Sequence, residues 1–135
     1  MSIQAEVGQQ LTGFTAKLSR VELARYAGAS GDFNPIHYND AAAAALGLPG
    51  VIAHGMLTMG IALRVVTDWA GDPSRVLSYY VRFTKPVVVP ATGAAEVSFA
   101  GTVTAVANGV ATISIEAICA EAKVLGSACA EVRLD

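Results

Sequence analysis

The chain has 135 residues, and its 9 basic against 11 acidic residues give a formal net charge of −2. With no basic cluster either, this balance excludes the electrostatic footprint of a nucleic-acid-binding protein. A length of this order suits one domain, which we expect to occupy residues 1–135. Charged residues make up only 15%, against roughly 25% in an average domain, so we expect a second subunit to cover part of the surface.

Export signals, disulfides and membrane spans are not expected. The first residues contain neither a basic stretch nor an apolar one, so we predict no secretion signal and a cytoplasmic location. Cys119 and Cys129 are too few for a disulfide framework and lack a metal-ligand spacing, and we interpret them as apolar fillers. Gly47 and Pro49 break the uncharged stretch over residues 41–63, which leaves less than the roughly 20 apolar residues of a membrane span.

The first part of the chain predicts a strand, a helix and a loop. Residues 11–18 alternate loosely, as a short strand does. Ser19 followed three residues later by Glu22 is a capping box, which predicts the start of a helix. Four residues of this helix are expected to face the core: Val21, Leu23, Ala24 and Ala27. Pro35 then predicts a loop over residues 32–38, because proline disfavours helical dihedrals at the residue before it.

A long apolar helix and a sheet are predicted next. After a short alanine-rich helix over residues 41–46, we predict a helix from near His54 to Trp69 or Ala70, about 16 residues long and buried on all sides. Strands are predicted over residues 76–89, 96–106, 111–119 and 123–134, with Asn108 and Gly109 as a hairpin turn. This order predicts an α+β fold in which an antiparallel sheet wraps around a long central helix.

Asp32 and His37 are the most distinctive pair of side chains in the chain. They lie five residues apart in the predicted loop, with Asn34 and Pro35 between them. Histidine in general titrates near pH 6.5, so His37 can exchange a proton close to neutrality while Asp32 orients water or accepts a proton from it. We expect Asn34 and Pro35 to fix the loop so that the pair converges on one substrate.

Gly55 lies at the expected start of the long helix, where backbone N–H groups have no intrahelical partner. The N-terminus of a helix carries roughly half a positive charge, and glycine allows another molecule to approach the backbone closely. Gly55 is therefore predicted to stabilise a negatively charged oxygen, an interaction that is worth about 3 kcal/mol in enzymes that use it.

Two motifs carry a family resemblance. Residues 26–37 read YAGASGDFNPIH and residues 53–60 read AHGMLTMG, and together they resemble the MaoC-like, R-specific hydratase and dehydratase family of the hot-dog fold. Residues 81–90 are also similar to that family, so the resemblance covers nearly the whole chain. Within the family, residues 54–60 and the WAGDP ending at residues 69–73 are most similar to the catalytic β subunits of mycobacterial-type (3R)-hydroxyacyl-ACP dehydratases.

The resemblance implies a hydro-lyase that interconverts (3R)-3-hydroxyacyl and trans-2-enoyl thioesters, linked to acyl carrier protein (ACP) in fatty-acid elongation. It implies that Asp32 and His37 are the catalytic pair, that Asn34 positions the substrate and that the N–H of Gly55 faces the thioester carbonyl. No metal or organic cofactor is implied. The expected partner is a second hot-dog subunit, either a copy of this chain or a different chain.

Three alternative functions stay open. An (R)-specific enoyl-CoA hydratase would use the same site on esters of coenzyme A (CoA). A hot-dog thioesterase would need an attacking water at C1 of the substrate. A non-catalytic partner subunit would be expected to have lost Asp32 or His37, and both are present.

The remaining polar candidates receive structural interpretations. His54 is the only other histidine, and we expect it to hold the loop by a hydrogen bond. A metal site formed by Asp32, His37 and His54 matches no zinc-ligand spacing, so none is predicted. Arg82 and Lys85 are expected to be solvated charges on a strand edge.

Overall fold

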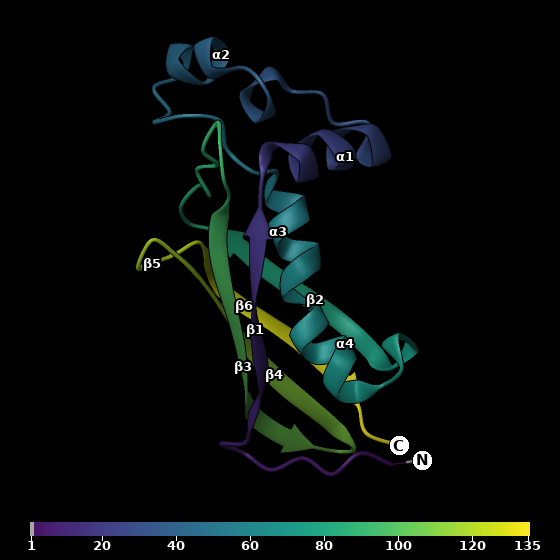
Figure 1. Ribbon diagram of the computed structural model, residues 1–135. Helices are drawn as coiled ribbons and strands as arrows, with labels where there is room; N and C mark the ends of the chain where they lie inside the picture. Colours follow the sequence, from purple (N-terminus) through teal and green to yellow (C-terminus); the bar gives the residue numbers. More distant parts are fainter. Residues whose placement is uncertain (1) are drawn as a thin grey trace.

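The computed structural model describes residues 2–135. A helical segment lies along a twisted antiparallel sheet (Figure 1). The elements in chain order are β1 (Gln10–Leu18), α1 (Arg20–Ser30), the 3₁₀ turn η1 (Pro35–His37), α2 (Asp40–Ala45), α3 (Gly55–Ala62), α4 (Arg64–Ala70), the 3₁₀ turn η2 (Pro73–Arg75), β2 (Val76–Phe83), β3 (Ala95–Ala107), β4 (Val110–Cys119), β5 (Ala122–Lys123) and β6 (Leu125–Arg133). The strand order is β1-β3-β4-β6-β2, and β5 pairs with β4. This arrangement confirms the predicted α+β fold class.

The sheet follows the predicted strands at its centre and departs from them at β2. Asn108 and Gly109 have φ values of 53° and 75°, and they form the predicted turn between β3 and β4. The strand predicted over residues 76–89 ends at Phe83. Pro86 and Pro90 follow, and proline has no N–H to donate to a neighbouring strand. After Phe83, the N–H of Thr84 still donates to the carbonyl of Val124 at 3.1 Å, and Val88 forms an isolated bridge with Ile52.

The long apolar helix is interrupted. It forms α3 and α4, which are separated at Leu63. The N–H of Val66 donates to the carbonyl of Leu63 at 2.9 Å, a bond that spans three residues and tightens this turn. The prediction of one uninterrupted helix is therefore wrong, although the two helices together occupy the predicted range.

Only one side of this helical segment is covered by the sheet. The residues of α3 and α4 that lie four apart on the outer side are exposed: Met56, Gly60, Arg64 and Asp68. Val65 and Val66 are buried on the inner side. A Cβ atom added to Gly101 in β3 would lie 2.7 Å from Cγ1 of Val65, so glycine is required where the helix meets the sheet. The expectation of burial on all sides is wrong for this chain, because the sheet covers one face only.

Helix α1 closes one end of the sheet and leads into the predicted loop. The backbone N–H of Ser19 donates to Oε2 of Glu22 at 2.7 Å, as a capping box requires. Leu23 and Ala27 are buried as predicted, but Val21 is 55% exposed and Ala24 is exposed as well. Fewer apolar residues of α1 are therefore buried than the sequence predicted.

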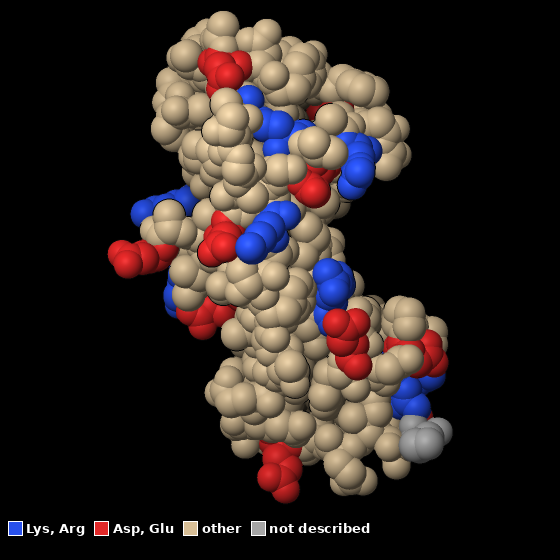
Figure 2. Space-filling model, viewed as in Figure 1, with Lys and Arg blue, Asp and Glu red and all other residues tan. Residues whose placement is uncertain are grey.

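Charged side chains are dispersed over the face seen in Figure 2, where small groups of both signs are separated by uncharged surface. One exposed pair, Lys17 and Glu96, links β1 to β3 at 3.8 Å. Across residues 2–135, no helix is both long and apolar enough to cross a membrane.

Candidate active site

The loop after α1 is shaped by its own short side chains. Helix α1 ends at Gly31, which has a φ of 78° and whose N–H donates to the carbonyl of Ala27 at 2.9 Å. Oδ1 of Asp32 then accepts from the N–H of Asn34 at 3.1 Å, and Oδ1 of Asn34 accepts from the N–H of Ile36 at 3.2 Å. These two successive turns hold Asp32 next to the 3₁₀ turn η1 that carries the histidine.

His37 is buried at the end of η1, with 7% of its surface exposed. Its Nδ1 atom lies 2.7 Å from the carbonyl oxygen of Ile52. A carbonyl oxygen can only accept a hydrogen bond, so Nδ1 carries the proton and its N–H donates a hydrogen bond to Ile52. In the neutral ring, Nε2 is then the atom with the free lone pair, and the backbone of Ile52 fixes this tautomer.

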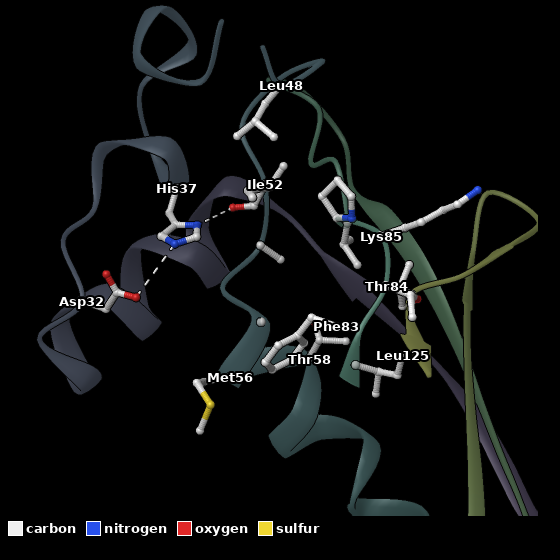
Figure 3. A pocket seen from close by; sticks show the side chains of 15 residues that line it. Asp32, His37, Leu48, Ile52, Met56, Thr58, Phe83, Thr84, Lys85 and Leu125 are labelled. Carbon is white, nitrogen blue, oxygen red and sulfur yellow. Dashed lines mark hydrogen bonds and ion pairs between the residues drawn. The ribbon is translucent and has the colours of Figure 1, made fainter. Parts of the chain in front are cut away.

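Nε2 of His37 faces the carboxylate of Asp32, as Figure 3 shows. The distance from Nε2 to Oδ2 is 3.9 Å. This is within the range of an ion pair but beyond that of a direct hydrogen bond. The side chain of Asp32 is 52% exposed and that of His37 is 8% exposed, so the pair has one buried and one open member. The structure thus brings the predicted pair together and leaves a gap between Nε2 and Oδ2 that another group can occupy.

Gly55 is the first residue of α3, and His54 is its N-cap. The N–H of a first helical residue has no partner within the helix, and none of the hydrogen bonds found within residues 2–135 engages it. A Cβ atom at this position would lie 2.9 Å from Cε1 of Phe83. Glycine therefore allows the Phe83 ring to lie beside a helix end whose N–H is free to donate.

Asp32, His37 and Gly55 all line one cavity of about 470 Å³. Thr58, Thr84 and Lys85 add polar groups to its wall. The remaining wall is apolar and consists of Leu48, Ile52, Ala53, Met56, Phe83, Pro86, Val87, Val124 and Leu125. Such a wall suits the alkyl part of a ligand, with a few polar groups at the place where chemistry occurs.

Asn34 does not line this cavity, in contrast to the other predicted site residues. Its side chain is used within the loop, where it accepts from Ile36. The structure therefore gives Asn34 a contact that shapes the loop and no contact with the cavity. Lys85 does line the cavity, but its amine points away from Asp32 and His37 in Figure 3.

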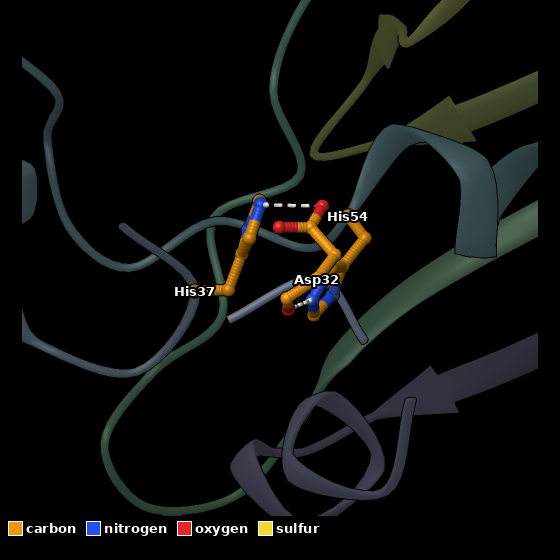
Figure 4. A group of neighbouring side chains, drawn as sticks. All are labelled: Asp32, His37 and His54. Carbon is orange, nitrogen blue, oxygen red and sulfur yellow. Dashed lines mark hydrogen bonds and ion pairs between the residues drawn. The ribbon is translucent and has the colours of Figure 1, made fainter. Parts of the chain in front are cut away.

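His54 is 1% exposed and packs against His37. Its ring stacks on that of His37, with centroids 3.8 Å apart and planes 23° from parallel (Figure 4). Its Nε2 atom lies 3.1 Å from the backbone carbonyl oxygen of Asp32, which confirms the predicted hydrogen bond to the loop. The ring of Tyr26 packs edge-on at 4.8 Å. Burial lowers the pKa of His54 below its ordinary value of 6.5, so the ring is neutral near pH 7.

The three side chains also form a cluster of potential metal ligands. One donor atom from each of Asp32, His37 and His54 lies within 4.8 Å of the others. However, the near-parallel rings direct their in-plane lone pairs along two planes rather than toward one point. This geometry does not favour the tetrahedral arrangement of zinc.

Three contacts of the site were not predicted from the sequence. The carbonyl of Ile52 that orients His37 is a backbone group, so its residue type gives no signal. Phe83 approaches Gly55 from β2, which is distant in the sequence. Thr58, which is buried and lines the cavity, lies three residues after Gly55 on α3. That spacing places the two residues on one helix face and is a signal that the sequence does contain.

Residues 2–119 match the family described as MaoC like domain. A relative, 3-hydroxyacyl-thioester dehydratase X of Mycobacterium tuberculosis, is 45% identical over 76 residues, which are 56% of this chain and 26% of that protein. The chain thus spans about a quarter of the length of this relative.

Solved structures confirm the predicted hot-dog fold. A MaoC-like dehydratase superimposes with a TM-score of 0.94 at 38% identity, covering 97% of this chain and 41% of that one. A chain of the ChsH1-ChsH2 complex from Mycobacterium tuberculosis superimposes with a TM-score of 0.86 at 26% identity, covering 98% of this chain and all of that one. Together with the matched sequence range, these likenesses show that the chain belongs to the family of MaoC-like domains.

Proposed function

We propose that the chain is a hydro-lyase that catalyses the reversible dehydration of (3R)-3-hydroxyacyl thioesters to trans-2-enoyl thioesters. One observation carries this proposal: Asp32, His37 and the unpaired N–H of Gly55 meet at one mostly apolar cavity. The similarity to a 3-hydroxyacyl-thioester dehydratase supports the same reaction.

In the hydration direction, a water molecule occupies the gap between the pair. A water placed about 2.8 Å from both Nε2 of His37 and Oδ2 of Asp32 spans their 3.9 Å separation. The angle between its two hydrogen bonds is then roughly 90°, near the angle that its two O–H groups favour. Both protein atoms accept, so the water donates to both and its oxygen lone pairs face C3 of the enoyl chain.

The remaining charge develops on the thioester. Addition of the water oxygen to C3 pushes the electron pair of the C2–C3 double bond toward C1 and creates an enolate. The N–H of Gly55 donates to the enolate oxygen, and the positive end of α3 stabilises its charge. A proton then returns to C2, so water has been added across the double bond; dehydration runs through the same steps in reverse. Asp32 and His37 together take one proton from the water as its oxygen bonds to C3 and deliver one proton to C2.

The carrier that we propose is ACP, in fatty-acid elongation, with CoA as the alternative. The apolar wall of the cavity supports an acyl substrate of either kind, because it contacts only the alkyl part. The free thiols of Cys119 and Cys129 agree with a reducing compartment such as the cytoplasm.

We also propose that a second hot-dog subunit, a copy of this chain or a different one, pairs with β2. Both β1 and β2 are edge strands of the sheet, and an unpaired edge exposes backbone groups. Three large apolar side chains on β2 are more than half exposed: Leu77, Tyr80 and Phe83. On β1, by contrast, an irregularity between Leu11 and Phe14 disturbs the edge. The apolar strand β2 therefore suits a partner better than β1 does.

Incubation of the purified chain with crotonyl-CoA tests the reaction. The expected result is loss of the enoyl absorbance and formation of (R)-3-hydroxybutyryl-CoA, identified by chiral chromatography. Release of free CoA, followed with a thiol reagent, would instead indicate a thioesterase. The absence of turnover on both the CoA ester and the same acyl group on ACP would indicate a non-catalytic partner subunit. A higher kcat/KM on the ACP substrate would support the proposed carrier.

A further inference from the structure

His54 is a buried titratable residue that the proposed chemistry does not use. It precedes Gly55 and is the N-cap of α3, so its backbone belongs to the end of the helix that faces the thioester oxygen. Its side chain extends to the other half of the site, where Nε2 meets the carbonyl of Asp32 at 3.1 Å. One residue therefore connects the loop that carries the acid–base pair to the helix end that carries the oxygen-binding N–H.

The tautomer of His54 follows from this contact. Because the Asp32 carbonyl can only accept, Nε2 of His54 carries the proton and Nδ1 carries the lone pair. Nδ1 is buried and has no hydrogen-bond partner within residues 2–135, so the opposite tautomer would leave a carbonyl oxygen facing a lone pair and an N–H facing no acceptor. The Asp32 contact therefore selects one neutral form of the ring.

The surroundings of His54 keep its ring in place. The rings of Tyr26 and His37 pack on it at 4.8 Å and 3.8 Å. Asp32 and His37 are the charged or titratable groups that influence it, together with the burial that disfavours its charged form. Nε2–H thus donates to the backbone of Asp32, and His54 is not among the residues that line the cavity.

We infer that His54 is a positioning residue, whose Nε2–H holds the backbone of Asp32 so that its carboxylate stays opposite His37 and beside the N–H of Gly55. This inference rests on the proposed function. A displacement of a catalytic group by about 1 Å can reduce a rate by about two orders of magnitude. The 52% exposure of the Asp32 side chain means that few other contacts restrain it.

Two substitutions separate the hydrogen bond from the ring stacking. In His54→Gln, the amide nitrogen lies as many bonds from Cβ as Nε2 does and can donate to Asp32, whereas the aromatic face is lost. In His54→Phe, the aromatic face is kept and the donor is lost. We expect kcat of His54→Gln within about threefold of wild type and kcat of His54→Phe at least about tenfold lower, with KM little changed in both. Equal kcat in wild type and His54→Phe, or equal losses in both variants, would overturn the inference.

A second readout does not depend on turnover. The chain has two histidines, so ¹⁵N-histidine spectra of wild type and His54→Gln assign both rings. We expect His54 to be protonated on Nε2 and bare on Nδ1 at neutral pH. The opposite tautomer, or a ring charged at pH 7, would overturn the inference. A wild-type chain that turns over neither thioester would contradict the proposed function, while the spectra would still decide whether Nε2 of His54 donates to Asp32.

Discussion

Nε2 of His37 lies 3.9 Å from Oδ2 of Asp32, and neither atom takes part in a hydrogen bond among those found within residues 2–135. The other polar atoms of both side chains are engaged: Nδ1 of His37 by the carbonyl of Ile52, and Oδ1 of Asp32 by the N–H of Asn34. Each side chain is thus held by one end and presents the other end to the same gap. Two acceptors that face each other require a donor between them, and a water molecule supplies two.

Replacement of either member of the pair should abolish most activity without unfolding the protein. Asp32→Asn removes the charge and His37→Ala removes the lone pair, and positioned acid–base groups typically contribute about 10²–10⁴-fold. We expect kcat on crotonyl-CoA to fall by that order in each variant. Asp68→Asn, an exposed carboxylate on α4, is the matched control and should retain wild-type kcat. Full activity in both variants would end the catalytic assignment.

The two glycines of α3 should respond differently to alanine. At Gly55 a Cβ atom would lie 2.9 Å from the Phe83 ring, whereas at Gly60 nothing lies within 4 Å. We expect Gly60→Ala to keep activity and to raise the free energy of unfolding by about 0.4–1 kcal/mol, since alanine favours helix. Gly55→Ala should lower kcat/KM by about tenfold or more, because a methyl group obstructs the approach to its N–H.

A double variant separates two explanations for Gly55. Phe83 is 55% exposed, so Phe83→Ala gives a new Cβ atom at position 55 room without opening the core. If Gly55→Ala acts only by displacing the ring, the double variant regains the activity of Phe83→Ala alone. We expect no such recovery, because the methyl group itself obstructs the approach of the thioester oxygen to the N–H of residue 55. Steady-state kinetics of the four proteins measure this coupling.

Acidification should destabilise the folded chain through His54. Burial lowers the pKa of His54 from 6.5 in the folded state. Below about pH 6.5 the unfolded chain therefore binds more protons at this residue, and stability falls until the lowered folded-state pKa is reached. Above about pH 6.5 the ring is neutral in both states and contributes no pH dependence.

Urea unfolding at about pH 7.5 and about pH 5.5 tests this expectation. His54→Gln should lose less free energy of unfolding between these two pH values than wild type does. The comparison isolates His54, because every other titrating group is shared. Asp72 and Glu22 do not titrate between these two pH values, since hydrogen bonds to Ser74 and Ser19 lower their carboxyl pKa values from 3.8 and 4.5. Equal losses in the two proteins would contradict a neutral buried ring.

A charge on β2 should disrupt subunit pairing. Tyr80 is 54% exposed on this edge strand, and Val21 is 55% exposed on α1, away from it. We expect Tyr80→Lys to convert a dimer into monomers in analytical ultracentrifugation, because lysine on an edge strand disfavours pairing. Val21→Lys is the control and should sediment like wild type. A Tyr80→Lys variant that still sediments as a dimer would place the interface elsewhere.

Features that depend on a few neighbouring residues were predictable from the sequence. The Ser19–Glu22 capping box and the Asn108–Gly109 turn are properties of short backbone segments, and both are present. The spacing of Asp32 and His37 placed two chemical groups in one loop, and the resemblance to a family connected that loop to Gly55. These signals suffice for the fold class and for candidate site residues.

Features that depend on distant contacts were not predictable. The sequence around the apolar residue Val21 does not indicate that its side chain is exposed. The run of apolar residues through Leu63 does not show where the helix tightens. Nor does any residue type reveal that the carbonyl of Ile52 selects the tautomer of His37. Packing and backbone contacts decide these features, and a linear pattern does not contain them.

The most direct test of the proposed chemistry is a crystal structure of the Asp32→Asn variant with crotonyl-CoA bound. We expect the thioester oxygen about 2.7–3.2 Å from the N–H of Gly55, with C3 opposite the gap between residue 32 and Nε2 of His37. A thioester oxygen bound away from Gly55, or an alkyl chain that places C1 rather than C3 at that gap, would contradict the account.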